Sequence, residues 1–146
     1  MDFHILNKIV SEALLNFQLI SEEEWELKPS PNKWSKKEIL GHLCDSAFTN
    51  IRRFVITQYT LNETIVYNQD QWVKAQNYQN IPTSEISTLW VVLNRQLVHI
   101  VENLSAEDLL KTCDTLSSQG LKPTLDFLAK DYITHLNHHL EAIFKK

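Results

Sequence analysis

Apolar side chains recur every three or four residues in four long segments of the chain, the spacing that places them on one face of an α-helix. These segments cover residues 2–24, residues 35 to about 59, residues 83–104 and residues 124–143. The apolar face of the last segment is formed by Leu125, Leu128, Tyr132, Leu136 and Ile143. The pattern therefore predicts four helices of about twenty residues each.

Local signals indicate where these helices begin and end. Ser35 and Glu38 have the spacing of a capping box, in which each side chain binds a free backbone amide of the first turn. A helix is therefore expected to start at Ser35. Residues 25–34 contain Pro29 and Pro31 and are expected to form a loop, because proline stops a helix and keeps the residue before it extended.

The helical period is lost over residues 60–82, the longest connection between predicted helices. Residues 71–79 are compatible with a short helix, and residues 63–67 are the best candidate for a strand. A connection of this length can cross a bundle from end to end, which allows the helices before and after it to lie parallel. We therefore expect an all-α fold, a four-helix bundle with a long crossover between helices 2 and 3, forming a single domain over residues 1–146.

The composition excludes several other classes of protein. Two glycines and four prolines in 146 residues are too few for the many tight turns of a β-sandwich or barrel. Gly41 and Gly120 are far apart, so the chain has no glycine-rich loop of the kind that holds phosphates. A net charge of −4, without a basic cluster, argues against a nucleic-acid partner.

Cellular location and assembly are less constrained by the sequence. No apolar run approaches the ~18 residues that a membrane span needs, and the first residues do not resemble a leader peptide, so a cytoplasmic protein is expected. Cys44 and Cys113 form no CxxC motif and are expected to be reduced thiols, with one disulfide between them as the alternative. A homodimer is compatible with the sequence, although no apolar stripe is left over to support it.

Three of the six histidines lie close together near the end of the chain. When the last helix is projected at about 100° per residue, His135 and His139 fall within about 20° of Leu128, inside the apolar face. His138 falls at the flank of that face. Two imidazoles four residues apart can converge on one metal ion. The alternative is a pair of core histidines that are satisfied by hydrogen bonds.

The second helix carries a polar stripe beside its apolar face, formed by His42, Ser46, Asn50 and Arg53. A solvated flank is one interpretation of this stripe. The other is that it faces the last helix, so that His42 adds a third nitrogen to the histidine pair. Three imidazoles leave coordination positions open, as reactive metal sites do, and zinc, nickel and ferrous iron all accept them.

Other polar and aromatic residues are candidates for the surroundings of this site. Asp45 follows His42 by one turn and would orient a ligand or a bound water, although its projected direction lies further from the core and also suits a solvated carboxylate. Trp72 would cap the pocket from the crossover, and Tyr132 lies one turn before His135 and two turns before His139. Arg53 would pair with a substrate carboxylate.

Three segments of the chain resemble the DinB superfamily. Within that superfamily they are similar to the YfiT-like proteins, which are regarded as metal-dependent enzymes. The resemblance lies in residues 34–46 with Asn50 and Arg53, in residues 131–143 with their HxxHH pattern, and in residues 67–78 of the crossover. Together these segments cover the chain from about residue 30 to its end.

The resemblance implies a four-helix bundle that holds a divalent metal ion on His42, His135 and His139. His138 would then be a neighbour of the ligands, and Asn50 and Arg53 would line the pocket. Related proteins include transferases and isomerases that use low-molecular-weight thiols, and a hydrolase role has also been suggested for the family. The partner would be a small-molecule substrate. The alternative is a non-catalytic, stress-related binding bundle that the metal only stabilises.

Overall fold

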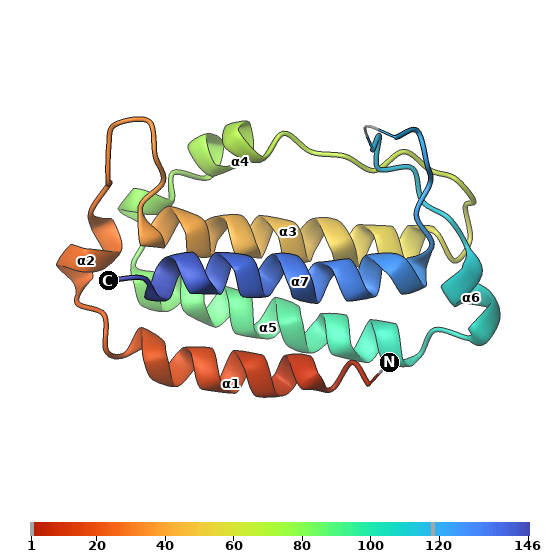
Figure 1. Cartoon of the computed structure of the whole chain (residues 1–146), viewed down its shortest axis with the longest axis horizontal. Helices are drawn as coiled ribbons and strands as arrows, with labels where there is room; N and C mark the ends of the chain where they lie inside the picture. Colours follow the sequence, from red (N-terminus) through yellow and green to blue (C-terminus); the bar gives the residue numbers. More distant parts are fainter. Residues whose placement is uncertain (1, 118) are drawn as a thin grey trace.

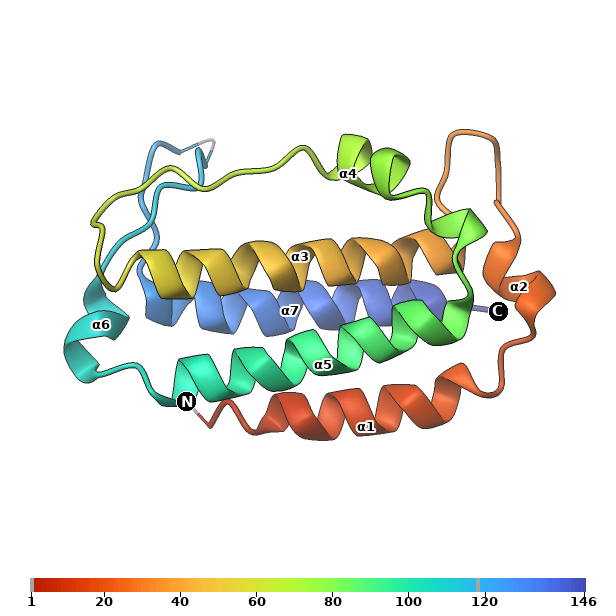
Figure 2. The same ribbon diagram turned by 180° about the vertical axis from the view of Figure 1, so that it is seen from behind.

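The computed structural model describes residues 2–117 and 119–146, and its four long helices lie side by side (Figure 1 and Figure 2). The long helices are α1 (Ile5–Phe17), α3 (Lys36–Ile56), α5 (Thr83–Glu102) and α7 (Leu125–Phe144). The connections contain the short helices α2 (Glu22–Glu26), α4 (Gln69–Gln76) and α6 (Ala106–Leu110) and the 3-10 turn η1 (Tyr78–Asn80). The structure confirms the predicted four-helix bundle.

The direction of the helices follows from the long connection between α3 and α5. In Figure 1 the chain runs along α3, returns over it through α4 and η1, and then runs along α5 in the same direction as α3. Helices α1 and α7 run the opposite way. The crossover expected over residues 60–82 is therefore present, and it covers one side of α3.

The predicted first helix is wrong in its extent, because the segment is divided into two helices. α1 ends at Phe17, and the Ser21 side chain then accepts a hydrogen bond from the Glu24 amide and starts α2. Ile20 still packs against the core from within the break. The apolar spacing continues across the break, and for that reason it does not reveal the break.

The other boundaries lie close to the predicted ones. The Ser35 and Glu38 capping box is present at the start of α3, and a second one, formed by Ser105 and Asp108, starts α6. Residues 63–67 do not form a strand; Thr64 makes only an isolated bridge. Residue 118, in the connection between α6 and α7, lies outside the described residues.

The core is built from the apolar faces of the four long helices. Phe17 packs its ring against three aromatic rings, 5.2 Å from Trp25, 5.5 Å from Trp90 and 5.7 Å from Phe144. Cys44 and Cys113 are buried free thiols, so the alternative of a disulfide is wrong. Among residues 2–117 and 119–146 we find no helix with the length and hydrophobicity of a membrane span.

Candidate metal centre

The packing of α3 against α7 brings three histidines together. His42, near the start of α3, places its Nε2 atom 3.3 Å from Nε2 of His135 on α7. One turn further along α7, Nε2 of His139 lies 3.1 Å from the same His135 atom. One nitrogen from each ring lies within 4.8 Å of the other two. We call these three residues the histidine cluster.

The imidazoles of the histidine cluster are neutral at pH 7. Burial, reinforced by the neighbouring imidazoles, lowers the pKa of His42 from 6.5 to about 3 and that of His139 to about 4. Burial, and then His138, also lowers the pKa of His135. A neutral imidazole keeps a lone pair on one nitrogen, and metal ions bind that lone pair.

The histidine cluster has the donor set and spacing that a divalent ion requires. Zinc binds imidazole nitrogens at about 2.0–2.1 Å, and tetrahedral coordination then separates two nitrogens by about 3.3 Å. The hydrogen-bond alternative fits less well, because both neighbours of His135 face its single Nε2 atom. Nδ1 of His42 is buried and has no partner among the described residues. Buried nitrogens of this kind are normally satisfied.

Two aromatic rings from irregular segments lie beside His42. The Trp34 ring lies 4.9 Å from the His42 ring, and the Tyr67 ring is stacked at 6.4 Å. Trp72, expected to cap the pocket, instead packs 5.8 Å from Tyr67 and 6.0 Å from Phe48. The sequence pattern did not indicate that Trp34 and Tyr67 are the rings beside the cluster.

A polar cavity of about 200 Å³ adjoins the histidine cluster, and we call it the inner chamber. It is lined by Ser46, Asn50, Arg53, Tyr67, Gln69, Asp131, Tyr132 and His135. The predicted polar stripe of α3 forms one wall, so the interpretation of this stripe as a solvated flank is wrong. Ser46 and Asn50 are buried.

Hydrogen bonds fix the orientation of several groups in the inner chamber. Arg53 donates from Nε and Nη2 to the carbonyl oxygen of Ile65, at 3.1 and 3.0 Å. Tyr132 donates its hydroxyl to Asn94 Oδ1 at 2.7 Å. A guanidinium has five N–H donors, so Arg53 retains three for a ligand.

Asp45 lies under the crossover and is not solvated, which corrects one of the two interpretations of this residue. Its Oδ1 accepts hydrogen bonds from the Tyr78 hydroxyl at 2.6 Å and from Gln76 Nε2 at 3.1 Å. Burial raises the pKa of Asp45, and the two hydrogen bonds offset part of this rise. Oδ2 is buried without a partner among the described residues. The projection placed Asp45 away from the core, and the crossover covers that face.

Gly41 provides the space that this arrangement needs. A Cβ atom at Gly41 would lie 2.1 Å from the Tyr78 ring, closer than real side chains approach. The ring therefore rests directly on the backbone of α3, which brings its hydroxyl to Asp45. Tyr78 and Gln69 were missed from the sequence, because a helical projection shows direction but does not show which part of the crossover lies above α3. Asp131, on α7, was also not singled out as a site residue.

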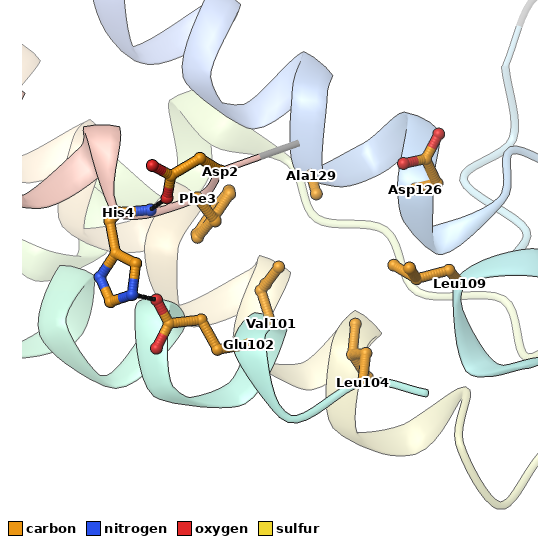
Figure 3. A pocket seen from close by; sticks show the side chains of 9 residues that line it. All are labelled: Asp2, Phe3, His4, Val101, Glu102, Leu104, Leu109, Asp126 and Ala129. Atoms are coloured by element: carbon orange, nitrogen blue, oxygen red, sulfur yellow. Dashed lines mark hydrogen bonds and ion pairs between the residues drawn. The ribbon is translucent and has the colours of Figure 1, made fainter. Parts of the chain in front are cut away.

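The remaining histidines are not part of the cluster. His138 is exposed, with its ring 5.5 Å from His139, in keeping with the expectation that it is a neighbour only. At the other end of the bundle, His4 Nε2 pairs with Glu102 Oε1 at 2.6 Å beside a cavity of about 470 Å³, as Figure 3 shows. We call this the His4 pocket.

Comparison with known proteins agrees with this description. The family model of the DinB superfamily matches residues 10–143. YfiT from Bacillus subtilis, described as a probable metal-dependent hydrolase with an unusual four-helix bundle topology, superimposes with a TM-score of 0.85 at 15% identity, covering 97% of this chain and 81% of YfiT. No curated protein sequence matches the chain. The chain belongs to the DinB superfamily.

Proposed function

We propose that this protein is a metal-dependent enzyme that holds one divalent ion on His42, His135 and His139. The observation that carries the proposal is the convergence of three neutral imidazoles beside a chamber large enough for a small molecule. Three protein ligands leave at least one coordination position open, which distinguishes catalytic from structural zinc sites.

A divalent ion at this position would supply Lewis-acid chemistry, favouring the deprotonated form of a bound thiol or water. The chain itself supplies the surroundings. The buried polar side chains of Ser46 and Asn50 offer hydrogen bonds to a substrate in the inner chamber. Arg53, oriented by Ile65, offers its remaining donors to a carboxylate.

Two reaction types suit this arrangement. In a thiol-dependent transferase, the nucleophile is a low-molecular-weight thiol, whereas in a hydrolase it is water. The description of YfiT as a probable metal-dependent hydrolase supports the second type. Zinc, nickel and ferrous iron are all candidates, because each accepts imidazole ligands. The two free thiols are in keeping with a reducing compartment, and we place the protein in the cytoplasm.

The test begins with metal analysis of the untagged protein, where we expect one divalent ion per chain. The loaded protein is then assayed with small thiols plus an electrophile, and separately with activated esters and amides. The variant His135→Ala/His139→Ala and the chelated wild-type protein serve as inactive controls. A protein that binds none of the three metals would overturn the proposal.

A non-catalytic bundle stabilised by its metal is the second candidate. The observation in its favour is that His42 and His139 both face the single Nε2 atom of His135, so hydrogen bonds alone do not satisfy the metal-free cluster. In that case added metal would raise the melting temperature, while neither assay would show turnover above the chelated control.

A further inference from the structure

A second cavity, the outer chamber, adjoins the inner chamber and has a volume of about 600 Å³. Arg53 and Asp131 line both chambers, and we call these two shared side chains the junction. A ligand in the outer chamber therefore lies within reach of Arg53.

The outer chamber is lined by large apolar side chains that the fold leaves accessible. Phe127 is 56% exposed and Leu121 is 68% exposed, while Leu128 closes the floor and is buried. Pro123 completes the apolar part of the lining. Exposure of these apolar side chains to water is unfavourable, and a ligand that covers them gains affinity in proportion to the apolar area it buries.

The charges around the two chambers favour an anion. Arg53 stands at the junction and Lys122 lines the outer chamber, whereas Asp131 is the one carboxylate among the lining residues of either. Arg53 retains three N–H donors after binding Ile65, and a guanidinium binds a carboxylate through two parallel hydrogen bonds. Asp131 weakens this attraction without cancelling it.

We propose that the outer chamber binds the apolar aryl or alkyl group of a carboxylic acid whose carboxylate is held by Arg53 at the junction. This inference rests on the proposed function, because it assigns to the same site a substrate that is an amphipathic acid. The reacting group lies beyond the carboxylate, in the inner chamber, and the apolar group lies over Leu128 and against Phe127.

The probe for this proposal is 4-phenylbutyrate, titrated into the full-length protein and followed by protein NMR and calorimetry, with and without zinc. We expect binding in both forms, with shifts of amide signals confined to residues 121–131 and residues near Arg53. Its uncharged analogue 4-phenylbutyramide should bind about tenfold more weakly, because it lacks the charge that Arg53 recognises.

Variants of exposed residues test the location without threatening the fold. Phe127→Ala should weaken binding of the probe about fivefold through the lost aromatic contact, and Leu121→Asp should weaken it further by repelling the carboxylate. Asp131→Asn should strengthen binding about twofold. Leu110→Asp is the matched control, because Leu110 is 74% exposed and does not line either chamber, and it should leave binding unchanged.

Several results would overturn the proposal. The first is that 4-phenylbutyrate does not bind. The second is that Phe127→Ala and Leu121→Asp bind it as tightly as the wild-type protein. The third is that Leu27→Asp does not bind it. Leu27 lines a separate apolar groove with Trp34 and Phe144. Zinc titration of the same variants keeps the two proposals distinct. If the protein binds zinc but not the probe, only the outer-chamber proposal is overturned. If it binds the probe but not zinc, only the proposed metal-dependent function is overturned.

Discussion

The histidine cluster and the His4 pocket contain the same side chain in opposite circumstances. His4 is mostly exposed, with a side-chain accessibility of 65%, and it meets a single carboxylate on Glu102. The three imidazoles of the cluster are buried or half-buried and face one another through the same nitrogen. A charged partner can satisfy one histidine, whereas three neutral imidazoles around one point have the arrangement that a shared cation would satisfy.

Proximity to other titratable groups does not by itself indicate a metal site. Asp2, Glu102 and Asp126 also lie around His4, but no cluster of three ligand atoms forms there among the described residues. An exposed ion pair contributes about 0–1 kcal/mol to stability. The buried cluster is less fully satisfied by hydrogen bonds, and a metal ion bound there would stabilise the folded state.

The largest expected effect is the loss of metal binding in His135→Ala/His139→Ala. Loss of an outer partner of a metal ligand already costs about 10- to 100-fold in affinity, and loss of two direct ligands should cost more. For the wild-type protein, zinc at about 100 times its Kd should add about 2.7 kcal/mol to the free energy of unfolding. Calorimetry measures the zinc affinity, and melting curves measure the added stability. His4→Ala is the control, and an equal loss of zinc binding in His4→Ala would contradict the assignment of the metal site to the histidine cluster.

The metal-free protein should also lose stability in acid. The pKa values of His42 and His139 in the folded state, about 3 and about 4, lie below the value of 6.5 expected in the unfolded chain. Below pH 6.5 the unfolded chain therefore binds protons that the folded one does not. The contribution of His139 to the free energy of unfolding falls until about pH 4, and that of His42 until about pH 3. Each such imidazole contributes at most about 1.4 kcal/mol per pH unit.

Urea unfolding of metal-free protein at several pH values between 7.5 and 4.5 measures this slope. The slope should be smaller in His135→Ala/His139→Ala, and unchanged in a variant that retains all three imidazoles, such as Lys8→Ala. Equal slopes in the wild-type protein and the double variant would show that the cluster does not resist protonation.

A change under the crossover should have an intermediate effect. Gly41→Ala puts a Cβ atom into the Tyr78 ring, which forces the crossover away from α3, and overpacking of this kind costs about 1–3 kcal/mol. Unfolding in denaturant measures the loss. Gly120→Ala is a useful contrast, because Gly120 has open space around it and any cost there comes from its positive φ of 66°. A Gly41→Ala variant as stable as the wild type would mean that Tyr78 is not tightly seated.

The smallest effect is expected at the His4 pocket. Glu102→Gln removes the charge partner of His4 and should change the free energy of unfolding by less than about 1 kcal/mol, because the pair is exposed and screened by solvent. Added salt should further reduce the difference in melting temperature between Glu102→Gln and the wild-type protein. A loss of several kcal/mol would show that the ion pair at this end of the bundle contributes as much to stability as the histidine cluster at the other end.

The helical period was sufficient to predict the bundle, and it narrowed the relation between the three histidines to two interpretations. His135 and His139 are four residues apart on an apolar face, and His42 begins a polar stripe on α3. Facing helices were therefore one of the two interpretations that the helical projection allowed, and the structure selects it. The capping box at Ser35 set the register of α3. The resemblance to the superfamily gave the same three residues.

The parts that the sequence did not predict depend on loops. Asp45 points away from the core of α3, and only the path of the crossover places Tyr78 above it. Trp34 and Tyr67 lie in irregular segments, where no period indicates the direction of a side chain. The break after Phe17 was missed because the apolar spacing continues to Ile20 although the hydrogen bonds of the helix do not.

The placement of the histidines along the chain has a kinetic consequence. His42 and His135 are 93 positions apart and meet only when α3 packs against α7. Contacts so distant in sequence tend to form late in folding. A metal ion on the complete cluster would then stabilise the native state more than the folding transition state. It would act mainly by slowing unfolding, and the refolding rate would be nearly the same with and without the ion.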